Sequence, residues 1–193
     1  MPPIVLASSS RYRAQLLENI GLSFTSSSPD IDESPTLNES PQALVERLSL
    51  AKATALSGTY DNHLIIGSDQ VASLNNSIIT KPGNHKRAKE QLMACQGRAV
   101  CFYTGLCLFN SHTGNYQITT VTTEVTFRSL TSQQIENYLV REQPYDCAGS
   151  FKCEGLGITL FERINSSDPN ALIGLPLIAL TSMLAQEGAY PLD

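Results

Sequence analysis

The chain has 193 residues, of which 41% are hydrophobic and 16% are charged, and its formal net charge is −5 at pH 7. This length is typical of one domain, and the apolar fraction suffices for a hydrophobic core, so the composition excludes a disordered chain. The negative charge excludes a basic protein that coats nucleic acid.

No run of the sequence approaches the roughly 18 consecutive apolar residues that a membrane-spanning helix needs. The N-terminal residues 1–13 lack the basic segment and the long apolar core of a signal peptide. The five cysteines form no CxxC pair that would indicate a zinc site or a redox motif. We therefore expect free thiols, a cytoplasmic location and no membrane partner.

Apolar periodicity and turn residues predict the secondary structure. In chain order the predicted elements are a strand at 3–7, a helix at 11–20, a loop at 29–42, a helix from 41 to about 57, strands at 63–74 and 77–80, a helix at 85–95, strands at 99–109 and 116–127, a helix at 131–141, a loop at 144–157, a strand at 158–163 and a helix at 176–187. Ser40 before Pro41 is typical of a helix start, and Thr131 with Gln134 forms a capping-box pattern.

Helices and strands alternate along the chain, with two hairpins among them. This order predicts an α/β fold in which helices flank a mixed, twisted β-sheet. We expect one domain over residues 1–193, either compact or bilobal.

A cluster of polar and basic side chains, which includes Ser8, Ser10 and Arg13, lies between the first predicted strand and helix. Free N–H groups at a helix N-terminus bind anions, and hydroxyl and guanidinium groups in the same turn strengthen such a site. An ordinary serine N-cap beside a solvated arginine is the alternative interpretation. The chain contains neither the GxxxxGK[ST] nor the GxGxxG motif.

Asp69 follows the apolar run 64–66, within the sequence Gly67-Ser68-Asp69-Gln70. Ligands of α/β sheets bind at strand ends, where an aspartate can bind a metal ion or take a proton from water. A turn-forming aspartate is the alternative.

Other charged residues lie in predicted loops or at the margin of a helix. The oxygens of Asp30, Asp32 and Glu33 suit Mg²⁺ or Mn²⁺, although a solvated loop would carry the same residues. Lys52 lies beside an apolar helical stripe, from which it can extend to solvent or into a cleft. Lys81 lies at the end of a predicted hairpin.

These patterns occur together in the order of a known family. The run Leu6-Ala7-Ser8-x-Ser10-x-x-Arg13, with Leu16-Leu17, resembles the N-terminal signature of the Maf family of nucleotide pyrophosphatases, once described as septum-formation inhibitors. The resemblance continues in order over essentially the whole chain, through Asp32-Glu33, Lys52, Gly67-Ser68-Asp69-Gln70, Lys81-Pro82, Ser150-Phe-Lys-x-Glu154-Gly and Gly174-Leu-Pro.

The resemblance implies a Maf or ITPase-like fold and hydrolysis of a nucleoside triphosphate between its α and β phosphates. It implies that the phosphates are held by Ser8, Ser10, Arg13, Lys52 and Lys81. It also implies a divalent metal ion (Mg²⁺, Mn²⁺ or Co²⁺) bound by Glu33 and Asp69, with Asp69 as the base that activates water. A triphosphate carries about four negative charges, so it requires such cations.

Three positions resemble the branch of the family that acts on 7-methyl-GTP: Tyr12, Gln70 and Glu154. A 7-methylguanine ring is cationic at neutral pH, so an aromatic face and a carboxylate suit it. The chain departs from the family at Arg11, where Pro is usual, and from the branch at Tyr12, where Trp is usual. Both departures change the mouth of the implied site.

Two alternatives remain at this point. A Maf-type pyrophosphatase could prefer other triphosphates, either pyrimidine or modified ones. A non-catalytic nucleotide-binding regulator of septum formation would also fit the resemblance. The resemblance also links the 7-methyl-GTP pyrophosphatase itself to arrest of cell division. Apolar positions of the hairpin 99–127 could face the core or a second copy, so a homodimer is one of the possible assemblies.

Overall fold

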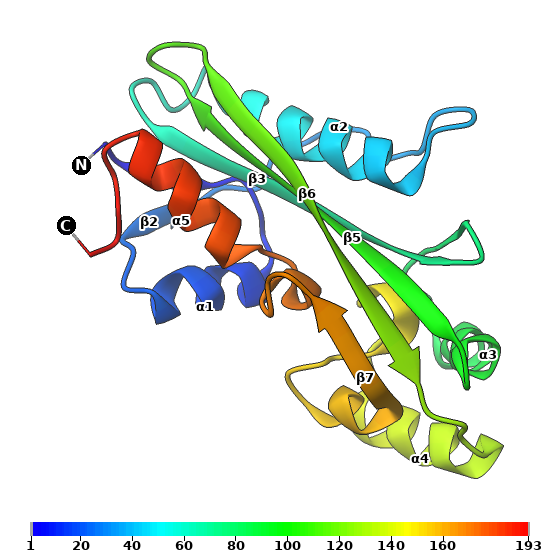
Figure 1. Ribbon diagram of the computed structural model, residues 1–193. Coiled ribbons are helices and arrows are strands. Elements are labelled where there is room, and N and C mark those ends of the chain that lie inside the picture. Colours follow the sequence, from blue (N-terminus) through cyan, green and yellow to red (C-terminus); the bar gives the residue numbers. More distant parts are fainter. Residues whose placement is uncertain (1, 193) are drawn as a thin grey trace. The chain divides into compact units, whose positions relative to one another are not determined.

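The computed structural model describes residues 2–192 (Figure 1). Its strands are β1 (Ile4–Leu6), β2 (Phe24–Ser26), β3 (Leu64–Leu74), β4 (Ser77–Ile79), β5 (Ala99–Asn110), β6 (Tyr116–Phe127) and β7 (Phe161–Ser166). Its α-helices are α1 (Arg11–Asn19), α2 (Pro41–Thr54), α3 (His85–Cys95), α4 (Ser132–Glu142) and α5 (Leu177–Gln186). Short 3₁₀ helices are η1 (Ala148–Ser150), η2 (Leu156–Leu160) and η3 (Ala171–Ile173).

Within the described residues the strands form one seven-stranded sheet, in the order β2-β1-β3-β5-β6-β7, and β4 pairs with β3. β1 pairs in parallel with β2 and with β3, whereas the pairs β3–β4 and β6–β7 are antiparallel. The sheet is therefore mixed, and the predicted α/β fold is confirmed.

The chain divides into two compact units. Unit 1 consists of the residues up to Asp69, Thr104–Val121 and the residues from Asp168 onward, and unit 2 consists of Gln70–Tyr103 and Thr122–Ser167. The extent of one functional domain over residues 1–193 stays a prediction.

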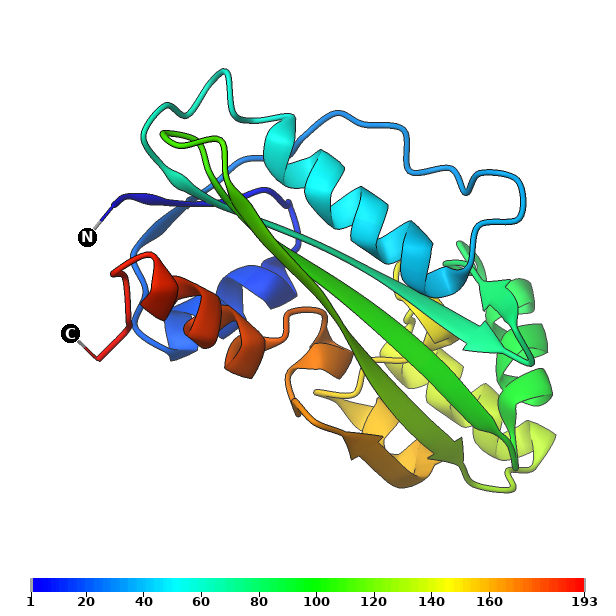
Figure 2. The ribbon, with the colours of Figure 1, turned by 45° about the horizontal axis from the view of Figure 1, so that its top comes forward.

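The alternation of side chains along β1 determines which helices cover each face of the strands in unit 1. Ile4 and Leu6 belong to a buried cluster with α1 and α5, whereas Val5 and Ala7 belong to a cluster with α2. Successive side chains of a strand point to opposite faces. Hence α1 and α5 cover one face and α2 covers the other, as Figure 1 and Figure 2 show.

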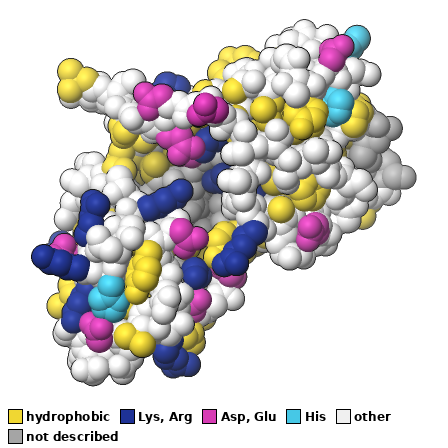
Figure 3. All heavy atoms as spheres, turned by 180° about the vertical axis from the view of Figure 1, so that it is seen from behind, with side chains coloured by type: hydrophobic (Ala, Val, Ile, Leu, Met, Phe, Trp, Pro, Cys, Tyr) yellow, Lys and Arg dark blue, Asp and Glu magenta, His cyan; other side chains and the backbone are white. Residues whose placement is uncertain are grey.

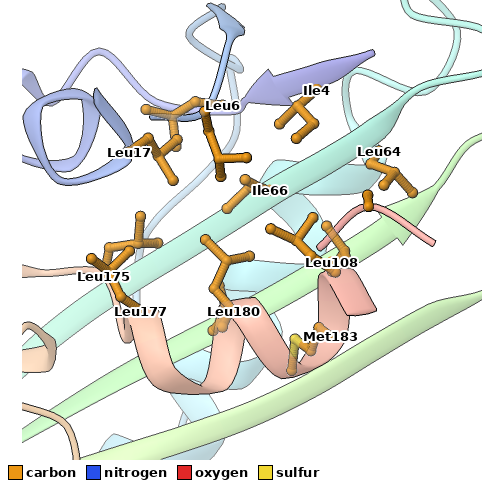
Figure 4. Close-up of a cluster of buried hydrophobic side chains, with 14 of the residues drawn as sticks. Ile4, Leu6, Leu17, Leu64, Ile66, Leu108, Leu175, Leu177, Leu180 and Met183 are labelled. Carbon is orange, nitrogen blue, oxygen red and sulfur yellow. The ribbon is translucent and has the colours of Figure 1, made fainter. Parts of the chain in front are cut away.

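The larger cluster is the core of unit 1. In Figure 4 the side chains of Leu6, Ile66 and Leu108 on the strands lie together with Leu17 of α1 and Leu180 of α5. Each is at most 1% exposed. Burial of one such side chain stabilises a fold by about 1.5–3 kcal/mol, so this cluster fixes the strand ends and the helices that carry the site residues described below.

Two glycines allow α2 to lie unusually close to the strands. A Cβ atom at Gly67 on β3 would lie 2.1 Å from the backbone oxygen of Ser49, and one at Gly105 on β5 would lie 2.4 Å from that of Val45. No side chain fits at either position. The close approach brings this face of α2 to the end of the apolar part of β3, where Asp69 lies.

Replacement of Gly67 by Ala is expected to lower the free energy of unfolding by about 3 kcal/mol, because α2 must move away from β3 to admit the methyl group. Gly58→Ala is the matched control, since a Cβ atom there has no neighbour within 4 Å. Chemical denaturation of both variants measures the difference. Equal stability of the two variants would contradict the close packing of α2.

Unit 2 is built around an aromatic core. Phe102, Phe127, Phe151 and Phe161 make edge-to-face contacts with ring centroids 4.7 to 5.9 Å apart. Such pairs stabilise a core beyond the burial of their area. Phe151 belongs to the motif that starts at Ser150, so the backbone of that motif is anchored in this core.

The structure corrects the sequence-based elements at two places. β2 was not predicted, because its three residues are half-buried or exposed and two of them are Thr and Ser. The strand predicted at 158–163 begins only at Phe161, because residues 156–160 form η2. In η2 the Leu156 N–H donates to Glu142 Oε2 at 2.9 Å, and Thr159 Oγ1 donates to the Leu156 carbonyl at 2.7 Å.

Candidate active site

The turn between β1 and α1 is held by its own serines. Ser10 is the N-cap of α1, and its Oγ accepts from the Arg13 N–H at 3.4 Å. Ser8 is buried, and its Oγ accepts from the Ser10 N–H at 3.1 Å and from an Arg13 guanidinium nitrogen at 3.4 Å. The predicted serine cap is confirmed. Arg13 is half-buried rather than solvated, with its guanidinium beside the helix N-terminus.

A buried lysine joins two carboxylates. The Nζ atom of Lys52 lies 2.7 Å from Asp69 Oδ1 and 2.7 Å from Glu33 Oε1. Lys52 and Asp69 are each 8% exposed, so Lys52 does not extend to solvent. Three residues far apart in the sequence therefore meet at one point, and the combined charge of the three side chains is −1.

Ser49 fixes the backbone of Asp69 to α2. Its Oγ accepts from the Asp69 N–H at 3.1 Å and donates to the Val45 carbonyl at 2.6 Å. Lys52 lies three residues further along α2, so it reaches the same part of β3 as Ser49. Asp69 lies in the middle of β3 (Leu64–Leu74) rather than at a strand end or in a turn, because β3 continues beyond its apolar part. This hydrogen bond sets the direction in which the Asp69 carboxylate leaves β3.

The loop that carries Glu33 is attached to α2 by Arg47. The Arg47 guanidinium donates to both carboxylate oxygens of Glu39, at 2.6 and 2.8 Å, and to the Ser34 carbonyl at 3.0 Å. Ser34 follows Glu33 directly in the chain. Arg47 thereby holds the loop where Glu33 contacts Lys52.

The same ion pair predicts a pH dependence of stability. The hydrogen bonds from Arg47 lower the pKa of Glu39 from 4.5 to about 2. A carboxylate with a lowered pKa in the fold stabilises it above its unfolded pKa, and this contribution is lost as the pH falls toward the folded value. We expect the free energy of unfolding to fall more steeply between about pH 5 and pH 3 in the parent than in Glu39→Gln, measured by denaturation at several pH values. Glu18→Gln, at an exposed position, is the control. If the free energy of unfolding changed with pH in parallel for the parent and Glu39→Gln, the linkage would be contradicted.

One carbonyl group links the arginine with the residue before Asp69. The Gly174 carbonyl accepts from Arg13 Nε at 2.8 Å and from Ser68 Oγ at 3.0 Å. Gly174 has φ +122°, which side chains other than hydrogen rarely tolerate. A Cβ atom there would lie 3.4 Å from Arg13 Nε, an ordinary van der Waals contact that the guanidinium tolerates. The glycine is therefore required for the backbone conformation.

The charges of these groups act on one another. Burial lowers the pKa of the Arg13 guanidinium, and the negative charges of Asp69 and Glu33 oppose that shift. An arginine keeps its charge in proteins, so unit 1 holds two cations, Arg13 and Lys52, close to two carboxylates. On the face drawn in Figure 3, Lys and Arg side chains stand singly or in small groups, several beside Asp or Glu.

The acidic loop is only partly assembled into this group. Asp32 is exposed, and its Oδ1 accepts from the Ser34 N–H at 2.9 Å, a contact that lowers the pKa of Asp32. Asp30 is exposed as well, and Glu33 is the member of the loop that reaches Lys52. No group of three or more His, Cys, Asp and Glu side chains that could hold a metal ion occurs within residues 2–192.

The remaining predicted site residues belong to unit 2, except Tyr12. Lys81 and Glu154 are exposed, and Gln70 is half-buried. The Gln91 side chain connects the segment that carries Lys81 with the segment that carries Glu154. Its Nε2 donates to the Thr80 carbonyl at 2.9 Å, and its Oε1 accepts from Ser150 Oγ. The structure thus brings the Lys81 loop and the Ser150–Glu154 motif together within unit 2.

Tyr12 is half-buried and is covered by Arg11, the residue that departs from the family pattern. The Arg11 guanidinium carbon lies 4.9 Å from the centre of the Tyr12 ring, and the guanidinium donates to the Tyr12 hydroxyl at 2.9 Å. The Arg11 side chain, which is cationic, therefore covers one face of the Tyr12 ring, the ring that the sequence predicts to contact a cationic 7-methylguanine base.

The cysteines carry no candidate chemistry. All five are free, as the sequence predicted. Burial raises the pKa of Cys107, Cys147 and Cys153 to about 12 in each case. These thiols are protonated at neutral pH, so they are poor nucleophiles and poor metal ligands.

Sequence reasoning missed three residues that position the site. Ser49 was not singled out in its helix, and Ser68 and Gly174 were quoted in motifs without a role. The signal for Gly174 was its place in Gly174-Leu-Pro. Ser49 gave no signal, because its role depends on the contact of α2 with β3.

The residues that form this arrangement, two carboxylates on a buried lysine beside a serine–arginine turn, lie within a match to a known family. The family model Maf, described as Maf-like protein, matches residues 3–187, and the chain belongs to that family. The resemblance recognised in the sequence is thereby confirmed.

Curated relatives cover nearly the whole chain. They include three that carry the name 7-methyl-GTP pyrophosphatase. The one from Nitrosococcus oceani is 54% identical over 98% of this chain and 95% of its own length. The one from Pseudomonas savastanoi pv. phaseolicola is 56% identical over 97% of this chain and 98% of its own length, and the one from Cupriavidus pinatubonensis is 52% identical over 99% and 96%.

Among solved structures, the Ham1 protein of Staphylococcus aureus is similar with a TM-score of 0.47 at 14% identity, over 66% of this chain and 72% of that protein. A HAM1 protein from Coxiella burnetii has a TM-score of 0.44 at 15% identity, over 66% and 73%. No helix formed by the described residues combines the length and apolar character needed to cross a bilayer.

Proposed function

We propose that this chain hydrolyses 7-methyl-GTP to 7-methyl-GMP and diphosphate, and so removes a modified nucleotide. The observation that carries the proposal is the convergence of Glu33 and Asp69 on Lys52, in the same unit as the turn of Ser8 and Arg13. Relatives that carry the name 7-methyl-GTP pyrophosphatase, at 52% to 56% identity, support this choice of substrate.

Phosphate binding is assigned first to the N-terminus of α1. The first turn of a helix presents unpaired N–H groups and a partial positive charge. Ser8 and Ser10 add hydroxyl groups to this turn, and Arg13 adds a guanidinium that can bind phosphate oxygens in pairs. Lys52 and Lys81 are proposed as further phosphate ligands, the second from its place in the motif. Together these groups can offset most of the charge of a triphosphate.

The two carboxylates fit a divalent cation. Glu33 Oε1 and Asp69 Oδ1 already surround one cationic atom at 2.7 Å, and oxygen is the donor that Mg²⁺ and Mn²⁺ prefer. Such ions bind commonly through one or two carboxylates, with water and substrate phosphate as the other ligands. We propose that Glu33 and Asp69 hold Mg²⁺, Mn²⁺ or Co²⁺, which when bound neutralises phosphate charge.

Asp69 is the proposed general base. Its carboxylate takes a proton from a water molecule, whose oxygen forms the new bond to phosphorus. The bond broken is the anhydride bond between the α and β phosphates. If water attacks the α phosphorus, diphosphate leaves with the bridging oxygen; if it attacks the β phosphorus, 7-methyl-GMP leaves with that oxygen and the water oxygen becomes part of diphosphate. Lys52 Nζ lies 2.7 Å from Oδ1, the oxygen that would hold the metal ion, so Oδ2 is the oxygen left to accept the proton.

Recognition of the base is assigned to Tyr12, Gln70 and Glu154. The positive ring of 7-methylguanine is attracted to an aromatic face and to a carboxylate, and an amide can donate to or accept from a base edge. Glu154 is exposed, so its carboxylate is accessible to such a ring.

Glu154→Gln is expected to lower the preference for 7-methyl-GTP over GTP, expressed as a ratio of kcat/KM values, by about tenfold, because a charge-assisted contact becomes neutral. The exposed Glu162→Gln in the same unit is the control. An unchanged ratio in Glu154→Gln would remove Glu154 from base recognition.

Release of diphosphate from a panel of triphosphates, each with Mg²⁺, Mn²⁺ or Co²⁺, tests the proposed function. We expect the highest kcat/KM with 7-methyl-GTP. A higher value with a pyrimidine or another modified triphosphate would instead support the broader Maf-type alternative. If no triphosphate released diphosphate, the enzyme hypothesis would be rejected in favour of a nucleotide-binding regulator of septum formation.

We also propose a cytoplasmic location, which agrees with the free thiols, since a reducing compartment maintains them. A homodimer and a link to arrest of cell division are proposed from the sequence. Both units, over residues 1–193, are assigned to one catalytic domain.

A further inference from the structure

Asp168 is a buried carboxylate to which the mechanism gives no role. It is 2% exposed. Its Oδ1 accepts from the Asn170 N–H at 3.0 Å, and its Oδ2 accepts from the Ile178 N–H at 2.7 Å. Through these two hydrogen bonds the Asp168 side chain links the start of the segment 168–178 to its end.

The second of these bonds caps α5 from outside the helix. The N-cap residue of α5 is Pro176, which supplies no side-chain hydrogen bond. The first N–H groups of a helix need partners, and a carboxylate beside them also favours the positive end of the helix. Asp168 is therefore the group that fixes the start of α5 relative to η3.

The segment that Asp168 closes contains Gly174. The Gly174 N–H donates to the carbonyls of Asn170 and Ala171, at 3.2 and 3.0 Å, and the Ala171 carbonyl also accepts from Thr104 Oγ1 at 2.9 Å. The peptide groups on both sides of Gly174 are thus set by the turn that begins at Asp168. The direction of the Gly174 carbonyl follows from this turn.

That carbonyl in turn holds Arg13. Its contact with Nε, at 2.8 Å, occupies one edge of the guanidinium, while a terminal nitrogen lies 3.4 Å from Ser8 Oγ. A guanidinium is planar, so two fixed contacts determine the direction of its remaining N–H groups. A side chain with several rotatable bonds would otherwise lose more conformational entropy when it bound phosphate.

We infer that Asp168 is a positioning residue for the phosphate-binding guanidinium, and that it acts through the Gly174 carbonyl on Arg13. The inference rests on the proposed function for the identity of the ligand. It adds a buried residue of the C-terminal segment to the site, although Asp168 itself touches neither substrate nor reacting atoms.

The test is a double-mutant cycle of Asp168→Asn and Arg13→Ala, with calorimetric binding of inorganic tripolyphosphate as the readout and metal ions chelated. We expect each single variant to weaken binding, Asp168→Asn by about tenfold, because an imprecisely held guanidinium binds less well. We expect the double variant to bind within about twofold of Arg13→Ala alone, since coupled residues are not additive. An Asp168→Asn effect of full size in the Arg13→Ala background would overturn the inference.

A stability control separates positioning from loss of fold. Thr131→Ala removes the capping box of α4 in unit 2, a change expected to cost about 1 kcal/mol without altering tripolyphosphate binding. If Thr131→Ala weakened binding as much as Asp168→Asn at equal loss of stability, the effect of Asp168 would be merely structural and the inference would fail.

The readout also separates this inference from the proposed function. Tripolyphosphate binding that depends on Arg13 and Asp168, in a parent protein that hydrolyses no triphosphate, would uphold the inference and reject the enzyme. Hydrolysis of 7-methyl-GTP, combined with tripolyphosphate binding that ignores Asp168, would do the reverse. A parent protein that binds no tripolyphosphate would reject the inference in either case.

Discussion

Asp69→Asn is expected to reduce turnover of 7-methyl-GTP by about 100-fold or more, because the variant removes the proposed base and retains its shape. The amide oxygen of the new side chain can still accept the hydrogen bond that Lys52 Nζ donates to Oδ1 at 2.7 Å. The backbone contact with Ser49 involves only the N–H of residue 69 and is also retained. Because Asp69 is also a proposed metal ligand, the variant is assayed at saturating metal ion, where the loss should lie in kcat, with a smaller change in KM.

Steady-state release of diphosphate by the folded variant measures this effect, with Asp61→Asn, an exposed residue of the same unit, as the control. Turnover within a few-fold of the parent would show that Asp69 is not the base. The same variant addresses the regulator of septum formation. A cellular effect that disappears with Asp69→Asn favours an enzyme, whereas one that persists favours a nucleotide-binding regulator.

Much of the fold follows from local signals in the sequence. The caps at Ser10, Ser40 and Thr131 were predictable, because N-capping depends on the residue itself and on the next few positions. β2 was not predictable, because its existence depends on the parallel pairing of Phe24 with Ile4 and not on its own residues. The division into two units was foreseen only as a bilobal alternative.

The site was predictable in its members and not in its contacts. The family motif indicated Glu33, Lys52 and Asp69, but residue types alone suited a solvated loop, a snorkelling lysine and a turn. Their convergence depends on the close approach of α2 to Gly67, a property of tertiary packing. Motif resemblance therefore supplied the residues, while packing determines that one lysine serves both carboxylates.

Lys52 competes with the proposed metal ion for the carboxylate oxygens of Glu33 and Asp69. Its Nζ atom lies at bonding distance from the same two oxygens that are proposed to hold the metal ion. An ammonium group and a divalent cation cannot both occupy that point, so the proposed metal ion would displace the Lys52 ammonium group, which would then be available to the phosphates. The residue then has two separate effects, one on the binding of the metal ion and one on the substrate.

Lys52→Met separates these effects, because methionine retains the length of the buried stem and removes the charge. We expect turnover to fall by about 100-fold or more, since a cation that offsets phosphate charge is lost. We expect Mn²⁺ to raise the melting temperature of the variant more than that of the parent, since the ammonium group no longer competes for Glu33 and Asp69. Lys89→Met, which removes a lysine paired with Glu136 in unit 2, is the control and should change neither quantity. A smaller Mn²⁺-induced shift in Lys52→Met than in the parent would show that the lysine and the metal ion do not share these oxygens.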